Sequence, residues 1–291
     1  MRTIFRYALS RSRGQILGWG IPLALLGMYL VAFWPTMAAQ QEQFIQLFKA
    51  YPRELMAFFG DIETMFTPEG FLTIEFFSYM PLILGIYAVL AGSGLLASEE
   101  ENGILDLVLA HPLSRTALLL GRLLAFVVVT VVILAILWLG FVVAMTWSPM
   151  DVGWDKMALP FISLLAVVLL FGTLALLLSM LLPSRRLAAM TAGILLVASY
   201  FITSLANVDE DLKAFARFSP LNYYQSGKAL NGLNLAWLGG LLAFALLFAL
   251  LAWWRFQRRD IRVGGEGSWR WPWPSPLALF RRRGAKAGTG A

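Results

Sequence analysis

The sequence predicts an all-α, polytopic membrane protein with six transmembrane helices. Of its 291 residues, 59% are hydrophobic and only 14% are charged, whereas soluble domains are nearer half apolar and about a quarter charged. The mean hydropathy is +0.72. Apolar segments of membrane-spanning length recur along most of the chain, and the basic residues are unequally distributed between the segments that connect them.

The six predicted spans follow from length and polarity. A transmembrane helix needs about 20 apolar residues to cross roughly 30 Å of hydrocarbon. The turn at residues 183–186 separates the fourth span from the fifth, which would otherwise form one long run, so five spans are the alternative. The segments that qualify are 16–38, 71–97, 118–147, 158–182, 187–206 and 233–254.

The orientation follows from the basic residues. Of the 23 Lys and Arg residues, 17 lie at the two ends of the chain or at the connections between spans 2 and 3 and spans 4 and 5. Cytoplasmic loops carry the excess of Lys and Arg in membrane proteins. We therefore expect both termini in the cytoplasm of a multi-pass protein of the inner (plasma) membrane, which agrees with an even number of spans.

The N-terminal segment, residues 1–15, is predicted to form a cytoplasmic amphipathic helix. Arg2, Arg6 and Arg13 share one helical face, and apolar side chains lie on the other. A disordered basic tail that only sets the topology is the alternative. A cleaved signal peptide is disfavoured, because the apolar run of 23 residues exceeds the usual length of about 7–15 residues.

The segments predicted outside the cytoplasm are 39–70, 148–157 and 207–231. An apolar stripe at helical spacing runs through the first, and Pro52 favours the start of a second helix there. The stripe either packs on the spans or contacts a substrate. Its members are Phe44, Phe48, Tyr51, Leu55 and Phe59.

The tail, residues 255–291, is rich in Gly, Pro and Arg and has no sustained periodicity. Trp269, Trp271 and Trp273 alternate with Arg and Pro, a composition that suits contact with anionic lipid headgroups. Beside a membrane span, nucleic-acid binding is disfavoured. The chain thus divides into the N-terminal helix (1–15), a six-span region (16–254) and this tail.

The sequence lacks the residues of common catalytic sites. It has no Cys and a single His, His111, so disulfides, thiol nucleophiles and histidine metal clusters are excluded. It contains no P-loop, no H-E-x-x-H and no G-x-S-x-G. Glu75 and Arg122 lie near span ends, and the span centres carry essentially no charge, which disfavours an ion-driven carrier. We expect no enzymatic activity, metal or cofactor in this chain, and an energy source elsewhere.

The connection between spans 2 and 3 is the most informative segment. Ser98 and Glu101 match a helix capping box, and Pro112 ends the apolar helix predicted over Ile104–Leu109. An apolar helix rimmed with acids and facing the cytoplasm suits docking into a groove of a partner protein. The alternative is a helix in the lipid interface, which the acids disfavour because the inner leaflet is negative.

Residues 99–122, EEENGILDLVLAHPLSRTALLLGR, resemble the signature E-E-x-G-T-L-x-x-L-L-x-x-P-x-S-R-x-x-x-x-x-G-K of ABC-2 type permeases, the membrane subunits of bacterial ABC exporters. Ile104 replaces the usual Thr, and Arg122 replaces the usual Lys. Ser219-Pro220 before span 6 and Arg258–Ile261 after it extend the resemblance. The positions that match the signature are Glu100, Gly103, Leu105, Pro112, Ser114, Arg115 and Gly121.

The resemblance implies that this stretch is the coupling helix, which fits a cleft on a separately encoded ATPase subunit. Two copies of the chain would pair with two ATPase subunits, which would bind ATP and Mg²⁺. A non-transporting membrane scaffold or assembly protein is the alternative function, and the substrate is not indicated. The residues expected to contact the ATPase are Glu99, Glu100, Glu101, Gly103, Ile104, Leu105, Val108, Pro112 and Arg115.

Span 5 is the predicted seam between two copies. Ala188 and Ala192, and likewise Ala189 and Gly193, are pairs of small residues four positions apart. Such pairs let helix backbones approach closely in lipid, within one chain or between two.

Overall fold

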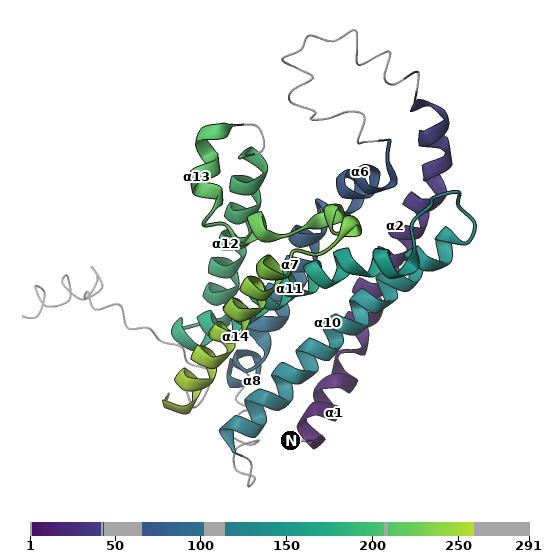
Figure 1. The fold of residues 1–291 in the computed structure, drawn as a ribbon. Helices are drawn as coiled ribbons and strands as arrows, with labels where there is room; N and C mark the ends of the chain where they lie inside the picture. The colour runs from purple at the N-terminus through teal and green to yellow at the C-terminus, as the bar shows by residue number, and fades with distance from the viewer. Residues whose placement is uncertain (1, 42, 44–65, 102–113, 207–208, 259–291) are drawn as a thin grey trace, which may run out of the picture.

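The computed structural model describes residues 2–41, 43, 66–101, 114–206 and 209–258 (Figure 1). Six helices in these ranges are long and apolar enough to cross a membrane, which confirms the predicted all-α, six-span fold. Their bounds lie within a few residues of the predicted ones. They are α2 (Arg13–Ala39), a composite helix (Pro68–Gly94), α10 (Arg115–Met145), α11 (Trp154–Leu181), α12 (Arg185–Leu205) and α14 (Leu235–Arg258).

The break between α11 and α12 lies at the predicted turn, and the five-span alternative is therefore wrong. Leu182 is extended (φ −90°, ψ 155°), as expected for a residue that precedes a proline. Ser184 then begins the next helix, because its hydroxyl accepts a hydrogen bond from the backbone N–H of Leu187 at 3.3 Å.

The N-terminal residues form a short helix, α1 (Arg2–Arg11), almost continuous with α2. As predicted, it is amphipathic: Ile4 and Phe5 are half-buried, whereas Arg6 is exposed. Helix α1 packs against α10. Its half-buried face therefore contacts protein, which a disordered topology signal would not do.

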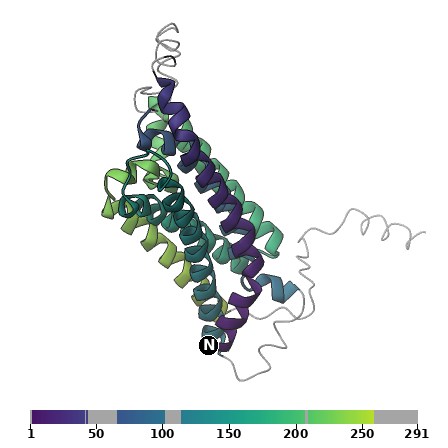
Figure 2. The same ribbon diagram turned by 90° about the vertical axis from the view of Figure 1, so that its right-hand side faces the viewer.

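The elements separate into two ends. Helix α1, helix α8 (Ala97–Glu101), the start of α10 and the end of α14 lie at one end, which we call the α8 end (Figure 1). Figure 2 shows the N-terminus at this same end in the turned view. Helices α6 (Pro68–Leu72) and α13 (Lys213–Ala216) lie at the other end, which we call the α6 end.

Helix α11 is the central element, with 72% of its most apolar stretch buried inside the protein. It contacts α7 (Met80–Gly94), α10, α12 and α14. The closest approach to α7 is at Gly92, where an added Cβ would lie 2.0 Å from the carbonyl oxygen of Gly172. An added Cβ at Gly172 would lie 2.3 Å from the ring of Phe126. Only glycine fits this crossing of α7 and α11.

The second span contains a π-helical turn, η1 (Thr73–Phe77), between α6 and α7. The wider turn brings two consecutive aromatic residues, Phe76 and Phe77, into the core. The ring centroids of Phe76 and Phe141 are 4.8 Å apart, and those of Phe77 and Phe161 are 5.3 Å apart. This aromatic cluster joins the second, third and fourth spans near the α6 end.

The connection before α14 folds back into the α6 end. It contains short helical turns η2 (Glu210–Leu212), η3 (Pro220–Tyr223) and η4 (Ser226–Asn231) besides α13. The Gln225 N–H donates to Ser163 Oγ at 3.1 Å, and the Tyr224 hydroxyl donates to the carbonyl of Phe77 at 3.1 Å. Burial raises the pKa of the Tyr224 phenol above its ordinary value. The connection therefore packs into the bundle as part of the fold.

Helix α14 continues to Arg258, four residues beyond the boundary predicted at residue 254. The guanidinium of Arg258 lies 4.5 Å from the ring centroid of Trp254, one helical turn earlier. The rest of the predicted tail, 259–291, and the apolar stripe of residues 44–59 lie outside the described residues.

Candidate functional site

Helix α8 leads into the stretch that resembles the permease signature. It begins at Ala97, one residue before the predicted cap Ser98. The N–H groups of Glu99 and Glu100 donate to the carbonyl of Leu96 at 3.1 and 3.2 Å. The carbonyl of Leu96, between α7 and α8, thus accepts the first hydrogen bonds of the helix.

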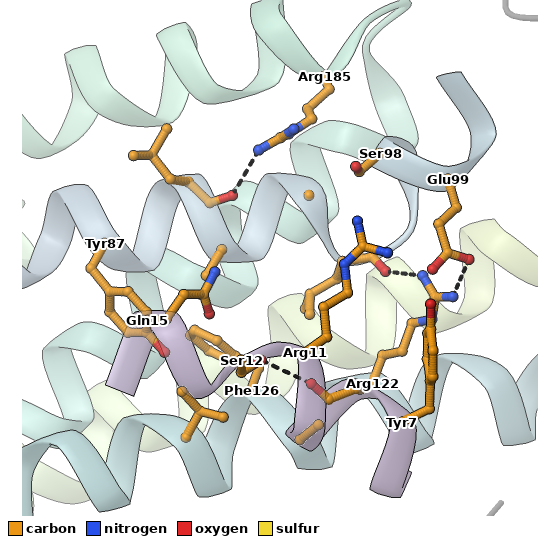
Figure 3. Close-up of a pocket in the computed structure, with 17 residues that line it drawn as sticks. Tyr7, Arg11, Ser12, Gln15, Tyr87, Ser98, Glu99, Arg122, Phe126 and Arg185 are labelled. Carbon is orange, nitrogen blue, oxygen red and sulfur yellow. Dashed lines mark hydrogen bonds and ion pairs between the residues drawn. The ribbon is translucent and has the colours of Figure 1, made fainter. Parts of the chain in front are cut away.

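Glu99 forms an ion pair with Arg122 of α10 (Figure 3). Arg122 also donates to the carbonyl of Leu95 at 2.6 Å. The Glu99 and Arg122 side chains are only 14% and 10% exposed. Arg122 therefore turns into the protein and fixes both the end of span 2 and the start of α8 to α10.

Glu101 contacts a third element. Its Oε1 accepts a hydrogen bond from the backbone N–H of Arg185, the first residue of α12, at 2.8 Å. A carboxylate at this position also interacts favourably with the positive end of the helix dipole. The side chain of Glu100, between the two contacting acids, is buried. Residues 99–101 thus anchor α8 to α10 and α12.

The start of α10 is anchored to the end of α14. Arg115 donates from Nη1 to the carbonyls of Phe256 at 3.2 Å and Gln257 at 3.3 Å. An arginine that donates to the last carbonyls of a helix satisfies groups that lack an intrahelical partner. Thr116 Oγ1 accepts hydrogen bonds from Trp253 Nε1 at 3.1 Å and Gln257 Nε2 at 2.7 Å.

Both flanks of the predicted coupling segment are therefore fixed to other spans. On one flank, α8 is bound to α10 and α12; on the other, α10 begins against α14. The remaining predicted contact residues, Gly103, Ile104, Leu105, Val108 and Pro112, lie outside the described residues.

Sequence reasoning did not identify the partners of these anchors. Arg185 is 84 positions from Glu101, and Gln257 is 141 positions from Thr116. Arg122 follows Arg115 by two helical turns and therefore lies on a similar face of α10. This spacing indicates that the two arginines share a face of α10. It does not indicate which other elements they contact.

Two of the cavities in the described part of the chain are large enough to hold a small molecule. One, of about 290 Å³, lies beside the Glu99–Arg122 pair at the α8 end. The other, of about 600 Å³, lies between α11, α12 and α14 and has mainly apolar and aromatic walls that include Trp237. In the described ranges, no three His, Asp or Glu side chains gather in a way that could hold a metal ion.

The predicted seam on α12 is only partly exposed. Ala188 and Ala192 are both 0% exposed, because they pack inside the same chain, and are therefore unavailable to a second copy. Ala189 and Gly193 are half-buried. The space beside Gly193 is open, and it belongs to a shallow apolar groove that also includes Met190, Ile194 and Val197. The Ala188/Ala192 pair thus packs within one chain.

Comparison with known proteins identifies the family. The model of the ABC-2 family transporter proteins matches residues 9–261, which include α2, α8, α10 and all later spans. No curated protein matches the sequence. Because the family match extends over most of a six-span membrane protein, the chain belongs to the ABC-2 family of transporter proteins.

Proposed function

We propose that this protein is the permease subunit of an ATP-driven exporter, in which a separate ATPase subunit hydrolyses ATP. The family supports the transporter role. The single observation that favours coupling is the double anchoring of the segment between α8 and α10. A permease that is driven by a separate ATPase needs a cytoplasmic contact segment that is fixed to the moving spans.

The proposed coupling route uses the contacts at the α8 end. A displacement of residues 102–113 by the ATPase reaches α10 and α12 through α8, because Glu99 binds Arg122 and Glu101 binds the start of α12. The same displacement reaches α14 through Arg115. Three spans, α10, α12 and α14, thus respond to one contact, and packed helices transmit such shifts because they deform little.

The proposed complex contains two copies of this chain and two ATPase subunits, which bind ATP and Mg²⁺. Both termini and the α8 end face the cytoplasm of the inner (plasma) membrane, in agreement with the distribution of basic residues. Lipid covers the remaining exposed apolar surface of the spans, and no nucleic acid takes part. Transport runs outward from the cytoplasm.

The exposed face of α12 is the proposed contact between the two copies. It bears large apolar side chains that do not pack within the chain, among them Met190, Ile194 and Phe201. Single cysteines at these three positions should cross-link between copies, whereas cysteines at the buried positions Ala188 and Ala192 should not. Equal cross-linking at both sets, or at neither, would contradict this contact.

Copurification tests the proposed function. A tagged chain, extracted gently from its native membranes, should bring down a P-loop ATPase, and only the complex should hydrolyse Mg-ATP. Candidate substrates should then stimulate hydrolysis by the reconstituted complex. A chain that purifies without any ATPase would instead support a non-transporting scaffold or assembly protein.

A further inference from the structure

The cavity at the α8 end has a cationic mouth and an apolar depth (Figure 3). Three arginines from three elements line it: Arg11 of α1, Arg122 of α10 and Arg185 of α12. Glu99 is the one carboxylate in its wall. The described lining residues therefore carry a positive excess of two charges.

The guanidinium groups of Arg11 and Arg185 form no ion pair among the described residues, although the Glu101 carboxylate accepts a hydrogen bond from the backbone N–H of Arg185. Arg122 is neutralised by its ion pair with Glu99. The Arg185 guanidinium reaches the carbonyl of Leu90 at 3.5 Å, which is a neutral group. In the described part of the chain, the Arg11 guanidinium makes no ion pair. Figure 3 shows it extending from α1 toward the Glu99–Arg122 pair.

The deeper wall of the cavity combines apolar side chains with two polar ones, Gln15 and Tyr87. The apolar part of this wall comes from Ala91 of α7 and from Phe126 and Val129 of α10. These residues lie progressively farther from the α8 end. The hydroxyl of Tyr87 lies 3.3 Å from that of Thr130, so its polar atom is already paired. Arginines at the mouth and apolar groups behind them match a molecule that has an anionic head and a hydrocarbon portion.

We propose that this cavity binds the phosphate headgroup of an anionic phospholipid from the cytoplasmic leaflet. Arginine recognises phosphate through charge-assisted, often bidentate hydrogen bonds. Under the proposed topology, the cavity opens at the level of the inner leaflet, whose anionic lipids attract basic groups. A headgroup between Arg11 and Arg185 links α1 to the start of α12, directly beside the anchor of α8.

The chain offers a matched control for each arginine. Arg13 lies two residues from Arg11, and Arg186 follows Arg185, but neither lines the cavity. The experiment measures binding of the first phosphatidylglycerol molecule to the purified full-length chain by native mass spectrometry, with phosphatidylcholine as the neutral comparison. The variants are Arg11→Gln, Arg185→Gln, Arg13→Gln and Arg186→Gln.

Each cavity variant should bind phosphatidylglycerol about fivefold more weakly, because it loses the contribution of roughly one cation at an anionic surface. Binding of phosphatidylcholine should be unchanged. The two control variants should bind like the parent. Equal losses in cavity and control variants, or no loss in either, would overturn the proposal. Arg11→Lys should restore much of the binding, and Arg11→Gln alone decides the outcome if Arg185→Gln does not fold.

A second arm distinguishes the lipid from free phosphate. Inorganic phosphate added at the same concentration as the lipid should leave phosphatidylglycerol bound, because it lacks the hydrocarbon portion. Displacement by inorganic phosphate would identify a free anion as the ligand and overturn the lipid assignment. The assay contains no ATPase, so its outcome is independent of the coupling proposal.

Discussion

The ion pair between Glu99 and Arg122 differs in its energetics from the other ion pair in the described residues, Glu210–Lys213. The Glu210 and Lys213 side chains are 88% and 60% exposed, and their contact lowers the pKa of Glu210. Exposed pairs contribute little to stability, because water screens them. The Glu99–Arg122 pair is largely buried, so removal of one partner leaves a charge away from water.

At the residue scale, we therefore predict that Glu99→Gln destabilises the folded chain by about 2 kcal/mol, below the roughly 3–5 kcal/mol for fully buried pairs. Thermal unfolding of the purified chain in detergent measures this change. The matched control, Glu210→Gln, removes a carboxylate from the exposed pair and should leave the melting temperature unchanged. Equal effects of the two substitutions would contradict the anchoring role assigned to Glu99.

At the element scale, the crossing of α7 and α11 has the least tolerance for added volume. An added Cβ at Gly92 meets backbone atoms of Gly172, and side-chain rotation does not relieve a backbone contact. Gly92→Ala should therefore separate the two helices and cost about 1–3 kcal/mol of stability, measured by thermal unfolding. Gly18→Ala is the control, because a Cβ at Gly18 meets nothing within 4 Å and alanine favours helix. Similar melting temperatures for the two variants would refute the close crossing.

The elements were predictable from sequence to different degrees. Apolar length predicts the six spans, and Pro183 predicts the break between α11 and α12, because both effects are local. The partner of Arg122 depends on tertiary packing, which spacing along the chain does not specify. Ala188 and Ala192 illustrate the same limit: small residues permit close helix contacts, but the sequence does not say whether the neighbour is the same chain or a second copy.

At the scale of the whole molecule, the proposed orientation places the α8 end in the cytoplasm and the α6 end outside. The chain contains no cysteine, so single cysteines can be introduced without removing any. An impermeant thiol reagent added to intact cells should label Asp151→Cys in the connection between α10 and α11. It should label Asn102→Cys only after the membrane is opened. Labelling of Asn102→Cys in intact cells would show that the orientation is the opposite of the proposed one.

The central claim is that residues 102–113 bind the ATPase, and Leu105→Asp tests it most directly. Burial of one large aliphatic side chain contributes roughly 1.5–3 kcal/mol, so its replacement by a charge should weaken ATPase binding at least about tenfold. Leu105→Met, which conserves volume and apolarity, should bind like the parent. Glu99→Gln should weaken binding far less than Leu105→Asp.

The measurement is copurification of the ATPase with each variant after its membrane insertion has been verified. Our account predicts that Leu105→Asp inserts normally, retains its fold and loses the ATPase together with substrate-stimulated ATP hydrolysis. If Leu105→Asp inserts normally and still binds and stimulates the ATPase like the parent, this segment is not the coupling helix.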